Sequence, residues 1–230
     1  MDFILGLGLA LPIATSTGIA TVTGIAEGVS YQRKVNEEAS HETRQLKFHV
    51  DVGASSSALQ GGMIVLRDDR LWVETKDGID KESRLPKTGH PFTGFYLQYP
   101  DPERMAVRGM VSTISRDPPV LNWIYVEKET FRVMYSNRSG SIAHHVGEWD
   151  WTEETGPESC LTFDGWEGFV AVEEEKGVWG LYFDMEDDGL KDRKKGRRVV
   201  EVTLYRRVIS DQEKTEHEVK GKNMLEKDGG

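Results

Sequence analysis

Short runs of Val, Ile, Leu and aromatic residues, separated by turn-forming residues, recur through the middle of this 230-residue chain. Such runs are typical of antiparallel strands joined by hairpin turns. Three pairs of runs lie close enough along the chain to form hairpins, with turns at Asp68-Asp69, Lys128-Glu129 and Lys176-Gly177. The paired runs are 63–66 with 71–73, 123–126 with 131–135, and 169–173 with 178–183.

Alternation is clearest in the run 198–208, where Val200, Val202 and Leu204 share one face and polar residues share the other. This spacing predicts a strand with one buried and one solvated face. Further strands are expected at 46–52, 92–99, 105–114 and 141–146. Roughly ten strands are too many for one flat sheet. Residues 46–209 therefore predict a mainly β fold, either an antiparallel β-barrel or a two-layer β-sandwich, with no long internal repeat in the sequence.

The chain before this domain has a different pattern, because residues 3–26 carry no charged side chain. About 20 apolar residues suffice for a helix that crosses a bilayer. A secretory signal peptide needs a positive n-region, whereas only Asp2 precedes this segment. Since Arg33 and Lys34 follow it, the positive-inside rule places the β domain in the cytosol. We therefore predict that residues 1–28 form an apolar, glycine-rich, membrane-associated helix.

Two alternatives for this leader remain open, a helix docked on the β domain and a cleaved signal peptide. Ala10, Ala14 and Gly18 recur every four residues, a spacing that lets two membrane helices approach closely and self-associate. Residues 29–45 are charged and free of proline, and they predict a helical stalk. Residues 210–230 form a polar tail with too few apolar residues to fold.

Composition narrows the classes of partner. The formal net charge is −10, which argues against nucleic acid because phosphate binding needs clustered Lys and Arg. The run from Lys191 to Arg198, KDRKKGRR, is a local exception that could touch acidic headgroups, or it is a solvated loop. The lone Cys160 suits a reducing compartment. No nucleotide-binding or nucleophile motif is found, so the sequence predicts no cofactor.

The densest group of polar and aromatic residues lies in 144–151 and 163–169. If these segments pair as strands, Trp149, Trp151 and Trp166 gather near several carboxylates and could bind a ligand. Trp stacks on sugar faces or flat ligands, while Asp and Glu orient hydroxyl groups. The alternative is that the three Trp side chains pack in the core, as aromatic residues of β domains often do.

His144 and His145 are consecutive, so on a strand they point to opposite faces and cannot bind one metal ion together. We predict no metal site. Asp184 to Gly189 resembles the start of a calcium loop, but Lys195 stands at the twelfth position where a Glu is required. The candidate acid–base residues are His144, His145, Glu148, Asp150 and Asp164.

Four stretches carry a resemblance to a known family: HPFTGFYLQYPDP (90–102), VSTISRDPPVLNWIYVEKET (111–130), GEWDWTEE (147–154) and GWEGFVAVEEEKGVWGLYFDMEDDGLK (165–191). They resemble an uncharacterised family of filamentous fungal proteins. The resemblance covers most of the chain and implies a eukaryotic intracellular setting. It brings no known activity, substrate or catalytic residue.

These observations leave two principal hypotheses. The first is a membrane-associated, non-enzymatic β-domain protein that binds a small apolar ligand or a protein partner. The second is a lipocalin-like isomerase or cyclase that acts on an apolar metabolite through a His–carboxylate pair. A third, carbohydrate binding through the three Trp side chains, is disfavoured by the intracellular setting.

Overall fold

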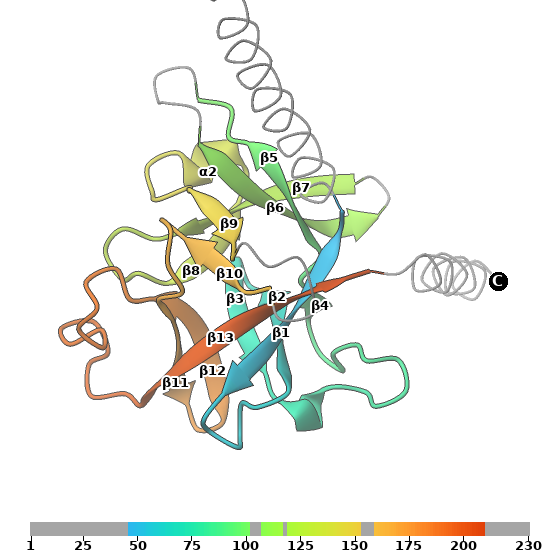
Figure 1. Ribbon diagram of the computed structural model, residues 1–230, viewed down its shortest axis with the longest axis vertical. Coiled ribbons are helices and arrows are strands. Elements are labelled where there is room, and N and C mark those ends of the chain that lie inside the picture. The colour runs from blue at the N-terminus through green and yellow to red at the C-terminus, as the bar shows by residue number, and fades with distance from the viewer. Residues whose placement is uncertain (1–45, 102–106, 117–118, 153–158, 210–230) are drawn as a thin grey trace, which may run out of the picture. The chain divides into compact units, whose positions relative to one another are not determined.

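The computed structural model describes residues 46–101, 107–116, 119–152 and 159–209 (Figure 1). The predicted leader, stalk and tail, with Ala10, Ala14 and Gly18, lie outside these residues. Backbone contacts divide the chain into two units, Met1–Thr43 and Arg44–Gly230, and every described residue belongs to the second. Within the described ranges, no helix combines the length and the apolar character needed to cross a membrane.

The described part of the chain contains 13 strands, and the strand pairs are antiparallel. Eleven strands join in one large sheet, and two short strands form a separate pair. The prediction of a mainly antiparallel β domain is therefore confirmed.

The strands recur in three consecutive groups, each with a first strand, a hairpin and a closing strand. The first group comprises β1 (Phe48–Ala54), β2 (Gly62–Arg67), β3 (Arg70–Glu74) and a closing strand split into β4 (His90–Pro91) and β5 (Gly94–Gln98). The second comprises β6 (Arg108–Arg116), β7 (Pro119–Val126), β8 (Val133–Ser136) and β9 (Trp149–Trp151). The third comprises β10 (Leu161–Phe163), β11 (Phe169–Glu175), β12 (Val178–Phe183) and β13 (Val199–Val208). Two short helical turns are η1 (Lys76–Gly78) and α2 (Arg138–Ser141).

Equivalent pairings show that the three groups are structural repeats. In each one, the segment that leads into or forms the closing strand pairs with the first strand of the hairpin. The partners are Val65 with Pro91, Val126 with His145, and Ala171 with Val200. The repeat is one of topology, which explains why the sequence shows no long internal repeat.

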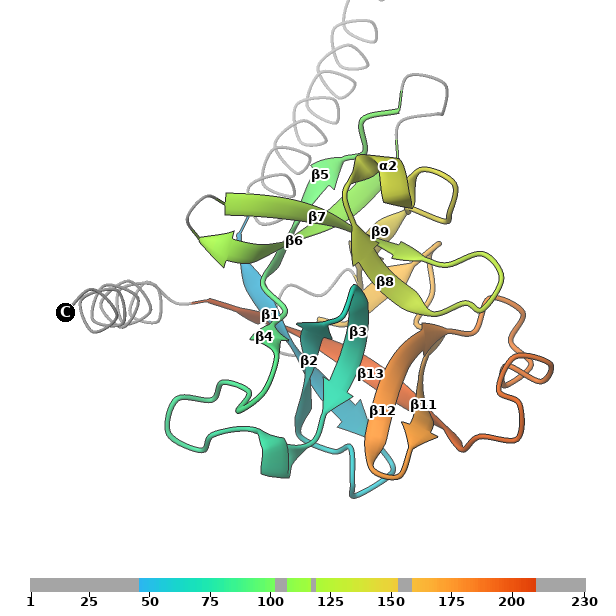
Figure 2. The ribbon, with the colours of Figure 1, turned by 180° about the vertical axis from the view of Figure 1, so that it is seen from behind.

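The three predicted hairpins are confirmed as β2–β3, β7–β8 and β11–β12. Asp68 and Asp69 have positive φ angles of 51° and 59°, as a two-residue hairpin turn requires, and Gly177 has a φ of 77°. The hairpins also contact one another: β3 pairs with β12 and with β8, and an isolated bridge joins Arg132 to Tyr182 (Figure 2). The three hairpins, each built from neighbouring segments of the chain, therefore contact one another at one end of the domain's sheet.

One predicted strand needs correction, and the last one agrees with the structure. Residues 141–146 do not form a strand, because α2 ends at Ser141 and turns follow it. The Asn137 side chain accepts a hydrogen bond from the Gly140 N–H at 3.0 Å and so caps this helical turn. The strand Val199–Val208 agrees with the prediction, since Val202 and Leu204 are buried while Glu201 is exposed.

Candidate functional site

The three predicted ligand-binding Trp side chains lie in different surroundings. Trp149 is 1% exposed on β9 and packs edge-on against Phe163, with ring centroids 4.7 Å apart. Trp151, two residues along the same strand, is also buried and lies under the guanidinium group of Arg206. Trp166 follows β10 and is 36% exposed. Trp166 is therefore the member of the trio that lies at the surface.

The candidate acid–base residues divide into two groups. The His144 ring stacks on Tyr125 with an interplanar angle of 7°, and its Nδ1 atom lies 3.6 Å from Oε1 of Glu127. The backbone of His145 pairs with Val126. The carboxylate beside His144 is thus Glu127, which sequence reasoning did not select.

The acidic candidates surround a different cation. Arg108 on β6 forms an ion pair with Asp150, and its Nη1 atom lies 3.5 Å from Oε1 of Glu148. Asp164 accepts a hydrogen bond from the Glu148 N–H at 2.8 Å. These contacts link β6, β9 and the turn after β10. Glu148, Asp150 and Asp164 therefore belong to a polar group around Arg108 that connects these strands.

The described core side chains leave little space at the one interior point where a gap is found. The space among the buried side chains of Val50, Leu71, Met110, Trp149 and Leu181 measures about 10 Å³. Such a volume is close to the minimum for a single water molecule. A small apolar ligand of the kind expected from the sequence does not fit in this space.

An open cleft of about 600 Å³ lies beside Trp166. The end of β1, the segment from Trp166 to β11, the turn after β12, and β13 line it. We call it the Trp166 cleft. Its volume falls within the range of small-molecule sites.

Two aromatic rings, those of Trp166 and Tyr205, line the Trp166 cleft, and each lies against a glycine. A Cβ atom on Gly168 would lie 2.5 Å from the Trp166 ring, and one on Gly53 would lie 2.5 Å from the Tyr205 ring. The Trp166 ring also contacts Phe183 edge-on, with centroids 5.2 Å apart. These close approaches hold the Trp166 ring in place while part of it stays exposed.

The polar lining of the Trp166 cleft is acidic. Glu167, Asp187 and Glu201 are exposed carboxylates, and no Lys or Arg is among the described residues that line the cleft. Asp184 is buried and accepts hydrogen bonds from the backbone N–H groups of Asp188, Gly189 and Leu190. The first carboxylate of the segment that resembles the start of a calcium loop therefore accepts hydrogen bonds from its own turn.

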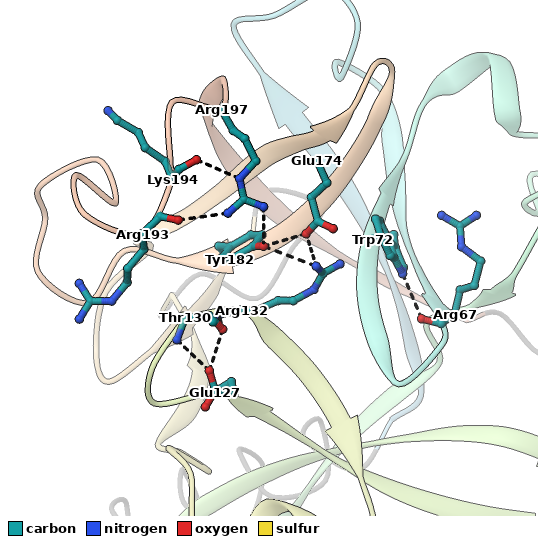
Figure 3. Close-up of polar contacts among 10 residues, drawn as sticks. All are labelled: Arg67, Trp72, Glu127, Thr130, Arg132, Glu174, Tyr182, Arg193, Lys194 and Arg197. Atoms are coloured by element: carbon teal, nitrogen blue, oxygen red, sulfur yellow. Dashed lines mark hydrogen bonds and ion pairs between the residues drawn. The ribbon is translucent and has the colours of Figure 1, made fainter.

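A second polar group occupies the place where the three hairpins meet (Figure 3). Arg132 forms an ion pair with Glu174, and its Cζ atom lies 4.4 Å from the centroid of the Trp72 ring. The Tyr182 hydroxyl group donates a hydrogen bond to Oε1 of Glu174, with 2.7 Å between the two oxygen atoms. We call Trp72, Arg132, Glu174 and Tyr182 the hairpin junction, because they join β3, the β7–β8 turn, β11 and β12.

Burial and pairing set the protonation of the hairpin junction. Burial raises the pKa of Glu174, but hydrogen bonds from Arg132 and Tyr182 and the positive charges of Arg132 and Arg197 outweigh it, so the pKa lies below its ordinary value. Burial first, and then the hydrogen bond to Glu174, raise the pKa of Tyr182. Glu174 is therefore an anion at neutral pH, and Tyr182 keeps its proton and donates to it.

The described residues define an all-β domain of three hairpin-containing repeats with clefts on its surface. Residues 24–210 match the family model of the fungal beta-trefoil domain, and because the match covers most of the chain, the chain belongs to this family. The expected fungal family of β-domain proteins is thus confirmed, without an activity. Comparison with curated proteins gives no match. Comparison with solved structures gives none either.

Proposed function

We propose that this protein is a non-enzymatic binding protein that holds a neutral, polyhydroxylated small molecule in the Trp166 cleft, and that this ligand is a free intracellular sugar or polyol, because a cytosolic β domain does not meet cell-surface glycans. The observation that carries the proposal is a fixed, partly exposed Trp ring beside exposed carboxylates in a cleft of about 600 Å³. The face of a sugar ring stacks on an aromatic ring, and carboxylates accept hydrogen bonds from hydroxyl groups.

The strand pairings also favour a surface site. We infer that β1, β5, β6, β9, β10 and β13 close into a barrel rather than a sandwich. β1 pairs with both β13 and β5, β5 pairs with β6, and β9 pairs with β10. The ion pair of Arg108 with Asp150 joins β6 to β9, and a bridge between Cys160 and Tyr205 joins β10 to β13. A closed ring whose core side chains leave so little space favours ligands at its outer surface.

Replacing Trp166 tests the cleft. The full-length protein is titrated with a panel of neutral mono- and oligosaccharides by calorimetry. We expect saturable binding to the wild type and at least about a tenfold weaker affinity for Trp166→Ala, because loss of an aromatic side chain at a binding hot spot costs about 2 kcal/mol or more. Leu121→Ala is the matched control, since Leu121 is 43% exposed and outside this cleft.

A second variant separates hydrogen bonding from stacking. Glu201→Gln keeps the size of the side chain and removes its charge, so we expect a several-fold weaker affinity for hydroxyl-rich ligands. Equal affinities of wild type, Trp166→Ala and Glu201→Gln would contradict the proposal. So would a wild type that binds no member of the panel.

Membrane association remains part of the proposal and rests on the sequence of residues 3–26 alone, with the β domain on the cytosolic side. We expect the full-length chain to stay with cell membranes through a carbonate wash, and a chain without residues 1–28 to remain in the supernatant. Release of the intact full-length chain by the wash would overturn this part and leave the cleft proposal untouched.

A further inference from the structure

A second cleft, of about 480 Å³, opens beside the hairpin junction. We call it the basic cleft, because positively charged side chains outnumber acidic ones in its lining. The cations are Arg70, Arg132, Arg193, Lys195 and Arg197, and the carboxylates are Glu127, Glu129 and Asp192. The basic run noted in the sequence supplies three of these cations, while the β2–β3 and β7–β8 hairpins supply the other two.

Several charged groups of this lining are already engaged. Both Nη atoms of Arg193 donate to the carboxylate of Glu186, at 2.8 and 3.1 Å. Arg197 donates to two backbone carbonyl oxygens of its own turn, which fixes its guanidinium group above Tyr182 (Figure 3). Glu127 accepts hydrogen bonds from the backbone N–H and the hydroxyl of Thr130, both at 2.7 Å. This carboxylate therefore serves the β7–β8 turn.

Three cations are left with unused hydrogen-bonding capacity. Arg70 and Lys195 are exposed and form no ion pair with any described residue. The Arg132 side chain is only 8% exposed, and its Nε and Nη2 atoms have no hydrogen-bond partner among the described residues. Glu174 already balances the Arg132 charge, so these two atoms add hydrogen-bonding capacity rather than net charge, and buried polar groups are otherwise nearly always paired.

We propose that the basic cleft binds the phosphate groups of a small polyanion, with Lys195 and Arg70 at its mouth and Arg197 and Arg132 beneath. Guanidinium and ammonium groups form strong charge-assisted hydrogen bonds with phosphate oxygens. A volume of about 480 Å³ accommodates a phosphorylated six-membered ring rather than a nucleic acid chain. The net charge of −10 also repels long polyanions, whereas a compact ligand meets only the local basic surface.

Charge-matched double variants test this site. The full-length protein is titrated by calorimetry with inositol hexakisphosphate and, separately, with inorganic phosphate. We expect saturable binding of inositol hexakisphosphate, and this binding should weaken with added salt. The affinity of Arg70→Ala/Lys195→Ala should be at least about tenfold weaker, because the variant loses hydrogen bonds to charged groups. The control Lys81→Ala/Lys191→Ala removes the same charge from exposed residues outside the cleft lining and should bind like the wild type.

Vesicles distinguish the source of the phosphate groups. Co-sedimentation compares phosphatidylcholine vesicles with vesicles that also contain phosphatidylinositol phosphates, because the predicted leader can bind both. A gain on the phosphorylated lipid that is lost in Arg70→Ala/Lys195→Ala assigns the site to a lipid headgroup, and binding of the soluble ligand alone assigns it to a free phosphorylated metabolite.

The proposal is overturned if the wild type binds neither, or if both double variants weaken binding equally. Loss of saccharide binding in Trp166→Ala is a separate result, because the two clefts are lined by different residues.

Discussion

Arg132→Met is expected to destabilise the domain by about 3–5 kcal/mol, the usual cost of removing one partner of a buried ion pair. The Glu174 side chain is only 15% exposed. In the variant its carboxylate loses the Arg132 cation and retains one hydrogen bond from the described residues, that of Tyr182. Thermal unfolding followed by circular dichroism should show a fall in Tm on the order of 10 °C. The effect is large because the pair joins two of the three hairpins.

The cost should depend on pH in a defined direction. The pKa of Glu174 is lowered in the folded protein, so its contribution to stability is present above the unfolded-state pKa and is lost as pH falls through the folded-state pKa. In Arg132→Met, burial persists without the Arg132 charge and hydrogen bond, and the pKa of Glu174 should rise. The stability difference between wild type and variant should therefore shrink as pH falls from neutral toward the ordinary range of carboxyl groups.

Two further variants make this prediction specific. Arg84→Met removes an exposed cation that lies 3.3 Å from Asp51, and a surface pair of this kind contributes only about 0–1 kcal/mol. Arg132→Met/Glu174→Met replaces both buried charges with apolar side chains and should recover much of the lost stability. A loss in Arg132→Met no larger than that in Arg84→Met would contradict the structural role of the hairpin junction.

The sequence predicted the hairpins because their signals are local. Asp68-Asp69 and Lys176-Gly177 lie at turns directly between the strands that they join, and period-two alternation fixes which side chains face inward. Contacts between hairpins lack such signals, since Arg132 and Glu174 are 42 residues apart. From the local sequence alone, Arg132 between Phe131 and Val133 is expected to face solvent. Only the contacts with the other hairpins show that it is buried.

Strand periodicity held more information about the candidate site than residue type did. Trp149 and Trp151 share one face of β9 with a charged residue between them, so the same alternation that marks a half-buried strand assigns both to the core. Trp166 follows Asp164 and Gly165, whose positive φ angles of 49° and 86° mark a turn. Turn residues lie at the surface, which separates this Trp from the other two.

The alternation in the last strand also predicted which of its residues line the Trp166 cleft. Glu201 and Tyr205 lie on the face of the last strand that the pattern assigns to solvent. The sequence did not predict that β11 pairs with β13. This pairing brings Phe169 and Val170 to the same cleft. This pairing spans about 30 residues, and no local pattern specifies it.

Trp149→Ala should be among the most destabilising single substitutions in the core, with a cost of roughly 3–5 kcal/mol. The removed indole leaves a void beside Phe163 and Phe169, whose rings lie 4.7 and 6.1 Å from it between centroids. The space beside Trp149 and Phe169 measures only about 10 Å³, so these neighbours can close the void only by leaving their own contacts. Urea unfolding followed by far-ultraviolet circular dichroism measures the loss without relying on Trp fluorescence.

Trp166→Ala provides the comparison that assigns different roles to the two Trp residues. Because Trp166 is partly exposed and its main described ring contact is Phe183, its removal should cost less than about 1 kcal/mol while ligand affinity falls. Trp149→Phe should fall between the two in stability, since it keeps an aromatic ring in the core. If Trp149→Ala kept wild-type stability and lost saccharide binding, the ligand would lie at β9, and the assignment of Trp149 to the core would be wrong.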